Sequence, residues 1–502
     1  MIEILDTTLR DGEQTSGVAF TSPEKLSILR LLIEELNVDR IEIASAKVSE
    51  GEHDAVKKMA QWAIKNGYID RLEVLGFVDG DISLKWIQET GCKVVNLLCK
   101  GSLKHCREQL CKTPEAHIAD IKKVIDFAQQ MNITVNIYLE DWSNGMLNSP
   151  EYVYLMVDNL KAFPIKRFML PDTLGVLNPI NTSEFCRDMK ERYPDLQFDF
   201  HAHNDYDLAV GNIFSAVYAG ITGIHTTING LGERAGNAPL ASVVSVLHDQ
   251  LKLKTNIKEN NLNMVSRIVE SYSGIRIPNN KPVIGDSVFT QCAGIHADGD
   301  HKNNLYYNEL LPERFGRYRE YALGKMSGKS NIKKNLEALG IELDEDSMRQ
   351  VTERIIELGD KKEMVTQEDL PYIVADVMRT ENTDNIKILN YSLGLTQGLR
   401  PTATVKMEID GQVYEQTSPG DGQYHAFSKA VWKIYNNIGK PKPMLTDYNV
   451  NIPTGGRTDA LVQTTISWNF NGRDFKTRGL DVDQTAAAIK ATVKMLNLIE
   501  KM

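Results

Sequence analysis

The stretch that decides the fold is residues 2–36, which reads IEILDTTLRDGEQTSGVAFTSPEKLSILRLLIEEL. The apolar run over residues 2–6 predicts a β-strand, a polar turn follows, and residues 22–36 predict an amphipathic helix. Thr21 and Glu24 form a capping-box pattern before that helix, and Pro23 lies in its first turn. The stretch is typical of one strand–helix unit of an α/β protein.

The same alternation continues through the first half of the chain. Eight β-branched, apolar runs predict strands over residues 2–6, 40–46, 72–77, 94–99, 134–141, 168–173, 198–205 and 223–230, with helical patterns between them. Eight strand–helix units within about 250 residues predict a TIM (β/α)8 barrel. An open, doubly wound sheet is the alternative on pattern alone.

The second half of the chain is organised differently. Residues 286–330 are polar and rich in turn residues, which predicts a linker subdomain, and residues 331–384 predict a small helical subdomain. Residues 385–502 twice repeat three short strands and a helix, with hairpin signals at Asp410-Gly411 and Asn471-Gly472. We therefore expect a catalytic barrel over residues 1–285, then the linker and helical subdomains, and a C-terminal βββα-repeat domain suited to binding or dimerisation.

Composition excludes several classes of function. The chain has 57 Lys and Arg against 67 Asp and Glu, a net charge of -10, so non-specific binding of nucleic acid is disfavoured. Its six cysteines form no CxxC pair, which favours free thiols in a reducing compartment. The sequence has neither a leader pattern nor a run of about 18 apolar residues, so we expect a cytoplasmic protein that does not bind membranes.

Two glycine-containing stretches invite a nucleotide interpretation that their spacing does not support. Residues 230–237 (GLGERAGN) are one residue too long for a dinucleotide fingerprint, and residues 324–330 (GKMSGKS) are one too short for a phosphate-binding loop. We expect neither a nicotinamide nor an NTP site, although the glycines of residues 230–237 would allow a close backbone approach to a ligand.

The side chains that carry chemistry in a TIM barrel lie at the C-terminal ends of its strands. His201 and His203 are two residues apart near the end of the seventh predicted strand, so both face the same side. Asp11 lies just beyond the first strand and adds a carboxylate. Such a set without a thiolate favours Mn²⁺, Mg²⁺, Fe²⁺, Co²⁺ or Zn²⁺ at an open site over a structural zinc. A buried core histidine is the alternative for either imidazole taken alone.

Three motifs in this order and spacing resemble a known family: residues 5–14 (LDTTLRDGEQ), 201–205 (HAHND) and 230–237. They are similar to the 2-isopropylmalate, homocitrate and citramalate synthases of the DRE-TIM metallolyase superfamily. The resemblance covers the whole chain, including residues 294–299 (GIHADG) in the linker and a tail similar to the LeuA-type regulatory domain. Residues 75–80, 138–145 and 422–424 resemble the pyruvate-using branch of the family.

The resemblance implies a Claisen-type condensation of acetyl-CoA with a 2-oxo acid, followed by hydrolysis of the thioester. It implies a divalent metal ion, Mn²⁺ or Mg²⁺ before Zn²⁺ or Co²⁺, held by Asp11, His201 and His203, with Asn237 as a further contact. Arg10 would stabilise negative charge on the keto or enolate oxygen. Thr173 would donate to the substrate carboxylate.

The methyl group of acetyl-CoA is a weak acid and needs a positioned base. Glu140 and His296 are both candidates, and the sequence leaves the choice open. The resemblance implies that His296 reaches the site from the partner subunit of a homodimer. It also implies that Asn304 and Tyr306 close over acetyl-CoA, a packed linker tyrosine being the alternative for Tyr306.

The size of the pocket selects the 2-oxo acid. Leu75, Leu98 and Tyr138 match the family's pocket positions, and Tyr138 stands where isopropylmalate synthases have a serine. Its ring would fill the space of an isopropyl group, and two leucines cannot pair a second carboxylate as homocitrate synthases must. We therefore expect pyruvate and (R)-citramalate, with 2-oxoisovalerate and 2-isopropylmalate as the alternative.

The tail resembles a feedback domain that binds a branched-chain amino acid at a dimer interface. The positions matching an isoleucine site are Tyr424, Leu445, Tyr448, Ile452, Val462 and Gln484. His425 and Val482 depart from the family pattern, which has an acidic residue and a proline there, and a dimerisation module with a vestigial pocket is the alternative. We expect the first step of a threonine-independent isoleucine pathway. A catalytically silent amino-acid sensor and a carbon–carbon lyase are the other readings, disfavoured by the complete set of site residues and by the long tail respectively.

Overall fold

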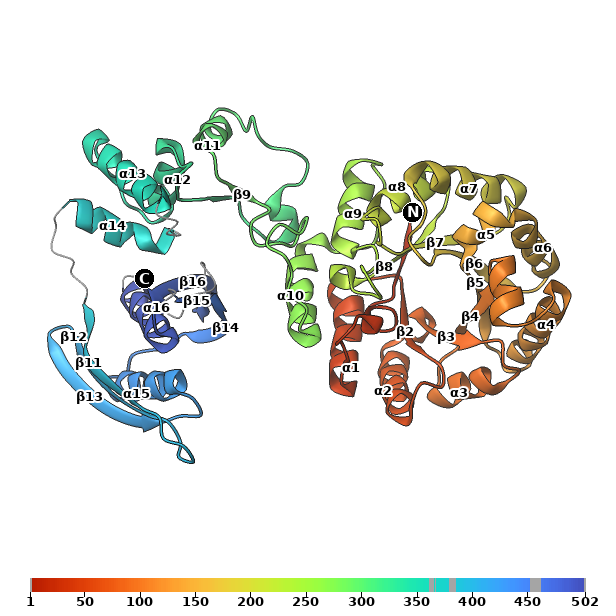
Figure 1. Cartoon of the computed structure of the whole chain (residues 1–502), viewed down its shortest axis with the longest axis horizontal. Coiled ribbons are helices and arrows are strands. Elements are labelled where there is room, and N and C mark those ends of the chain that lie inside the picture. The colour runs from red at the N-terminus through yellow and green to blue at the C-terminus, as the bar shows by residue number, and fades with distance from the viewer. Residues whose placement is uncertain (1, 361–364, 366, 379–384, 452–461, 501–502) are drawn as a thin grey trace. The chain divides into compact units, whose positions relative to one another are not determined.

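The computed structural model describes residues 2–360, 365, 367–378, 385–451 and 462–500. The chain folds into two compact units, Met1–Thr290 with Tyr306–Glu320, and Gln291–Leu305 with Tyr321–Met502 (Figure 1).

The first unit contains a closed barrel of eight strands that pair in sequence order, each parallel to its neighbours. The strands are β1 (Glu3–Asp6), β2 (Arg40–Ser45), β3 (Leu72–Phe77), β4 (Val94–Lys100), β5 (Thr134–Glu140), β6 (Ile165–Asp172), β7 (Phe198–Ala202) and β8 (Gly223–Thr226). The predicted TIM barrel is confirmed, and the open-sheet alternative is wrong because β1 pairs with β8.

Helices surround the barrel (Figure 1). They are α1 (Ser22–Arg30), α2 (Glu50–Asn66), α3 (Ile82–Thr90), α4 (Pro114–Gln130), α5 (Trp142–Asn148), α6 (Pro150–Leu160), α7 (Pro179–Arg192), α8 (Ala209–Tyr218), α9 (Leu240–Asp249) and α10 (Leu262–Ser273). The capping box before α1 is present, since the backbone N–H of Thr21 donates to the Glu24 carboxylate over 2.7 Å. The helix itself ends six residues earlier than expected, because the chain widens into a π-helical turn over Leu31–Glu35.

Two of the strands are shorter than their sequence patterns. The predictions of residues 198–205 and 223–230 overrun β7 and β8, which end at Ala202 and Thr226. His203 and Asn237 instead form an isolated bridge between the two loops.

The interior of the barrel contains buried charged and polar side chains beside one small apolar cluster, which is separate from the main apolar core of the barrel unit. Arg40 of β2 donates to Asp199 of β7 over 2.5 Å, and Asn96 of β4 donates to Glu42 of β2 over 2.8 Å. Because these strands are not neighbours, the bonds cross the inside of the barrel. Charged groups buried in this way are tolerated because each is paired.

The second unit begins with helical elements. A two-stranded sheet of β9 (Thr290–Gln291) and β10 (Glu320–Tyr321) lies at the boundary between the units. α11 (Gly294–His301) follows β9, and α12 (Lys329–Ala338), α13 (Glu345–Asp360) and α14 (Leu370–Val377) follow β10. Ile332, Leu336, Val351 and Ile355 are buried in a small core of their own, where the sequence predicts a helical subdomain.

The predicted βββα repeat is confirmed in the rest of this unit. The first copy consists of β11 (Ile386–Gly394), β12 (Thr402–Ile409), β13 (Gln412–Pro419) and α15 (Gln423–Asn437), and the second of β14 (Met444–Asn451), β15 (Val462–Phe470), β16 (Arg473–Asp481) and α16 (Gln484–Ile499). Each copy forms an antiparallel three-stranded sheet, and both helices pack into one core with Phe427 and Trp468. Within the described ranges, no helix has the length and hydropathy to cross a bilayer.

Candidate active site

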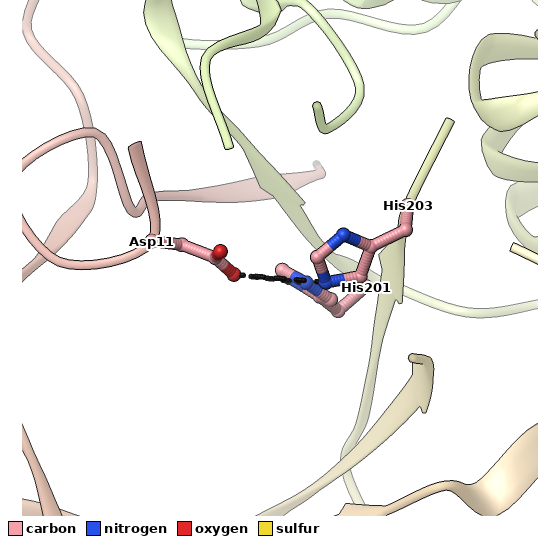
Figure 2. Close-up of side chains that lie close together, drawn as sticks. All are labelled: Asp11, His201 and His203. Atoms are coloured by element: carbon pink, nitrogen blue, oxygen red, sulfur yellow. Dashed lines mark ion pairs between the residues drawn. The ribbon is translucent and has the colours of Figure 1, made fainter. Parts of the chain in front are cut away.

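The C-terminal end of the barrel brings Asp11, His201 and His203 together, as Figure 2 shows. Oδ2 of Asp11 lies 3.2 Å from Nε2 of His201 and 3.9 Å from Nε2 of His203. The two imidazoles face the same side because their residues are two apart at the end of β7, and Asp11 follows β1 across a tight turn. One carboxylate oxygen and two ring nitrogens therefore converge from the C-terminal ends of β1 and β7.

The electrostatics of this cluster suit a divalent cation. Burial would raise the pKa of the Asp11 carboxyl, but the Arg10 guanidinium and the imidazoles hold it well below its usual range. Burial, together with the adjacent His201, lowers the pKa of His203 to about 3, so that imidazole is neutral. A carboxylate and neutral imidazoles are the protonation states that bind a metal, and the donor set without sulfur fits Mn²⁺, Mg²⁺ or another metal of mixed N/O preference.

Asn237 lies next to the cluster, paired with His203 in the bridge between the loops. Its amide N–H donates to the carbonyl of Leu231 over 3.1 Å, while its buried amide oxygen accepts no hydrogen bond among the described residues. A buried acceptor without a donor is costly. This oxygen is therefore available to a cation or to a water molecule bound to one.

Arg10 is held beside the cluster by three groups. Its Nε donates to Glu42 over 2.5 Å, one terminal nitrogen lies 3.1 Å from Asp11, and the other donates to the Tyr138 hydroxyl over 3.5 Å. Glu42 is wholly buried and is further held by Asn96. The sequence missed Glu42, although a glutamate inside an apolar strand pattern was a signal that it pairs with a cation.

The predicted pocket residues come together at the same end of the barrel. Leu75 on β3, Leu98 on β4 and Tyr138 on β5 pack in one apolar cluster with Leu5 and Met169. The Tyr138 and His201 rings form a T-shaped pair with 6.2 Å between their centroids. Tyr138 is therefore the member of the apolar cluster that contacts the cluster of Asp11, His201 and His203.

Glu140 and Thr173 end the neighbouring strands. Glu140 forms an ion pair with Lys100, its register partner on β4. Thr173 follows β6, and its hydroxyl oxygen accepts a hydrogen bond of 2.9 Å from the backbone of Asp141. The hydroxyl proton of Thr173 is then available to an acceptor. Lys100 was not predicted as a site residue, because the predicted strand ended one residue before it.

Residues 230–237 form a loop tied to its neighbours by Arg234. Its guanidinium donates to both oxygens of Asp205, over 2.8 and 3.0 Å, and to the carbonyl of Thr173. A Cβ atom on Gly232 would lie 2.2 Å from the Asn237 amide nitrogen, so this glycine makes room for Asn237. The glycine at position 232 thus permits a close contact between two parts of the same loop.

Comparison with known proteins agrees with this geometry. Residues 1–269 match the HMGL-like family, residues 283–363 the homocitrate synthase post-HMGL domain-like family, and residues 364–500 the LeuA allosteric (dimerisation) domain. The chain belongs to the HMGL-like family. The metal dependence of HMGL-like enzymes agrees with the cluster of Asp11, His201 and His203.

Relatives that are similar over nearly the whole chain narrow its assignment within the HMGL-like family. An (R)-citramalate synthase of Methanocaldococcus jannaschii is 32% identical over 501 residues, covering 99% of each chain. A 2-isopropylmalate synthase of the same organism is 33% identical over 510 residues, covering 99% of this chain and 94% of that one. A Methanopyrus kandleri protein assigned to the (R)-citramalate synthases is 34% identical over 466 residues, covering 93% of this chain and 89% of the relative. This HMGL-like chain is thus an acyltransferase of the citramalate and isopropylmalate synthase branch.

Three residues with expected roles lie in or beside the segment that joins the two units of this HMGL-like enzyme. His296 lies in α11 and Asn304 follows that helix, both within Gln291–Leu305 of the second unit. Tyr306 begins the segment assigned to the barrel unit. The side chain of His296 is half-buried, and those of Asn304 and Tyr306 are exposed.

The C-terminal domain contains a cavity of about 660 Å³, within the range of small-molecule sites. Four of the six predicted effector residues line it: Tyr424, Leu445, Tyr448 and Gln484. His425 also lines it and lies 3.3 Å from the Asp421 carboxylate. Val462 begins β15 and is not among the lining residues, Val482 is exposed, and Ile452 lies outside the described residues.

Proposed function

We propose that the chain is an (R)-citramalate synthase, which condenses acetyl-CoA with pyruvate and water to give (R)-citramalate and CoA. The observation that carries this proposal is the Tyr138 ring, packed with Leu75 and Leu98 beside Arg10. A pocket closed by a tyrosine and two leucines suits a methyl substituent. It offers no charge for the second carboxylate of 2-oxoglutarate.

The 2-oxo acid would bind at the cluster beside Arg10. A divalent cation held by Asp11, His201 and His203, with Asn237 as a further contact, would polarise its keto group as a Lewis acid. Arg10, held by Glu42 and Tyr138, would donate to the oxygen on which negative charge develops. Thr173 would donate its hydroxyl proton to the substrate carboxylate.

Condensation requires that a base take a proton from the acetyl methyl group before the new carbon–carbon bond forms. Glu140 and His296 remain the two candidates. Lys100 orients the Glu140 carboxylate through their ion pair. His296 would act from the partner subunit of a cytoplasmic homodimer, with Asn304 and Tyr306 over acetyl-CoA. Water would then cleave the thioester and release CoA.

Discrimination between pyruvate and 2-oxoisovalerate must come from steric exclusion of the larger isopropyl group. The isopropyl group has two more carbons than a methyl group, and each buried carbon contributes about 0.8 kcal/mol. Burial alone would thus favour the larger substrate. The Tyr138 ring reverses this preference only by occupying the space, since overpacking of a closed site costs about 1–3 kcal/mol or more.

We further propose that isoleucine binds in the C-terminal cavity and regulates the enzyme, in a pathway leading to isoleucine. Apolar and aromatic walls with the Tyr448 hydroxyl and the Gln484 amide nearby suit a branched, apolar amino acid. The match to the LeuA allosteric domain supports this assignment.

The experiment that tests the proposed reaction is release of free thiol from acetyl-CoA with Mn²⁺ or Mg²⁺ present. Pyruvate, 2-oxobutyrate, 2-oxoisovalerate and 2-oxoglutarate are compared in parallel, each with and without chelator. We expect fastest release with pyruvate, lost on chelation. Preference for 2-oxoisovalerate would contradict the pocket assignment, and release with none of the four would contradict the reaction.

A further inference from the structure

A chain of buried polar groups runs behind the Tyr138 ring. The Tyr138 hydroxyl lies 2.8 Å from Nδ1 of His225 on β8, and Nε2 of His225 lies 3.2 Å from Asp199 on β7. β5 and β8 are not neighbours, so the first bond crosses the barrel interior. The side chains of His225 and Asp199 are fully buried.

The surroundings of Asp199 decide which atom carries each proton. Arg40 donates to its Oδ2 over 2.5 Å and Arg167 to its Oδ1 over 3.2 Å, so Asp199 is a carboxylate that only accepts. The Nε2 of His225 must then be the donor to Asp199. A neutral imidazole with its proton on Nε2 has an acceptor at Nδ1, which fits the 2.8 Å contact with the Tyr138 hydroxyl.

The acceptor at Nδ1 fixes the Tyr138 hydroxyl in turn. Tyr138 must donate its proton to His225, which leaves only lone pairs of its oxygen for the Arg10 nitrogen 3.5 Å away. Turning the ring out of the pocket would break this bond and leave Nδ1 of His225 buried without a donor. An unsatisfied buried acceptor of this kind disfavours the displaced state about tenfold or more.

We propose that His225 and Asp199 are positioning residues that lock the Tyr138 ring across the substrate pocket and thereby set the size limit for the 2-oxo acid. This inference rests on the proposed function, because it assigns the source of the preference for pyruvate. The ring excludes larger substrates only while the hydroxyl is anchored. Without the hydrogen bond to His225, a larger substrate displaces the ring.

The test compares kcat/KM for pyruvate and 2-oxobutyrate in four variants: Tyr138→Phe, His225→Phe, the double variant and His225→Asn. We expect the ratio of kcat/KM for pyruvate to kcat/KM for 2-oxobutyrate to fall about tenfold in both Tyr138→Phe and His225→Phe. The double variant should fall no further, because both changes remove the same bond. The Asn amide oxygen can take the place of Nδ1, so His225→Asn should recover part of the ratio.

A merely structural role would lower activity on both substrates and leave their ratio unchanged. That result, or additive losses in the double variant, would overturn the inference. Should His225→Phe fail to fold, Tyr138→Phe and His225→Asn together decide, since the first removes the hydroxyl's bonds to both His225 and Arg10 and the second leaves the Arg10 contact in place.

A second measurement is independent of turnover. The ¹⁵N spectrum of histidine-labelled full-length protein, with His225 assigned by its loss in His225→Asn, should show a protonated Nε2 and an unprotonated Nδ1. The reverse tautomer would overturn the anchor. Failure of the wild type to use pyruvate would instead overturn the proposed function, and the tautomer would still decide the anchor.

Discussion

Arg10 shows how single residues in this site depend on their partners. Its guanidinium contacts Glu42, Asp11 and Tyr138 in three directions, which a lysine ammonium on a flexible stem cannot reproduce. We expect Arg10→Lys to lower kcat with pyruvate about 100-fold or more. Binding of Mn²⁺, followed by calorimetry, should change much less.

The matched control is Arg30→Lys, since Arg30 is exposed and pairs with Glu34 in the next helical turn. It should retain wild-type kcat. Near-normal turnover in Arg10→Lys would contradict the role assigned to this guanidinium.

Tyr138 carries the second prediction at this scale. Tyr138→Ser opens the space that the ring fills between Leu75 and Leu98, so the ratio of kcat/KM for 2-oxoisovalerate to that for pyruvate should rise about 10-fold or more. Tyr218→Ser, at an exposed tyrosine on α8, serves as the control. An unchanged ratio in Tyr138→Ser would show that the ring does not limit substrate size.

Spacing along the chain made part of the site predictable. His201 and His203 could be assigned to one side because side chains alternate along a strand. The partners Glu42, Lys100 and His225 could not be predicted in this way. Their bonds to Arg10, Glu140 and Tyr138 join segments that are far apart in the sequence. Such contacts depend on barrel closure and register, which hydrophobic periodicity does not encode.

Individual elements followed their sequence patterns where apolar periodicity dominates. All eight barrel strands form where predicted, and the deviations lie at their ends. β7 and β8 stop early, and the residues that follow them, His203 and Thr227, instead form isolated bridges with Asn237 and Pro239. Ends of this kind are decided by polar contacts between loops, which lie beyond a single strand pattern.

One helix gives a pH prediction at the scale of elements. His117 on α4 accepts a hydrogen bond of 3.1 Å from the backbone of Lys100, which ties α4 to the end of β4. Burial, with Lys112 nearby, lowers the pKa of His117 to about 4. The unfolded chain, with a histidine pKa near 6.5, therefore binds more protons than the folded chain between about pH 6.5 and pH 4.

This difference in proton binding makes the folded state less stable as the pH falls. His117 stabilises the fold fully above about pH 6.5, and its contribution falls by up to about 1.4 kcal/mol per unit as pH drops towards 4. The difference in thermal midpoint between the wild type and His117→Gln, measured from pH 7.5 to 4.5, should accordingly shrink. A difference that grows on acidification would contradict the assignment.

At the scale of the whole molecule, the internal repeat was predictable because hairpin signals and helix patterns recur in order. The cavity lined by Tyr424 and Tyr448 was not, since it forms only where β14 of the second copy meets α15 of the first. The resemblance to a regulatory domain pointed to four of its lining residues. It also included Val462, which the structure places outside the lining.

Ligand binding in this cavity predicts a thermal shift. A ligand at 100 times its Kd adds about 2.7 kcal/mol to the free energy of unfolding. If isoleucine has the lowest Kd, it should raise the melting temperature of the intact protein more than leucine or valine at the same concentration. Tyr448→Ala should abolish the shift, whereas Tyr318→Ala, at an exposed tyrosine, should preserve it. No shift with any of the three amino acids would rule out the effector assignment.

The most direct test of the central claim is a competition between two substrates in one vessel. Equimolar pyruvate and 2-oxoisovalerate are incubated with acetyl-CoA, Mn²⁺ and the full-length protein, and the two products are quantified by mass spectrometry. The product ratio equals the ratio of the two kcat/KM values. We predict a large excess of citramalate over 2-isopropylmalate, and an excess of 2-isopropylmalate would contradict the account.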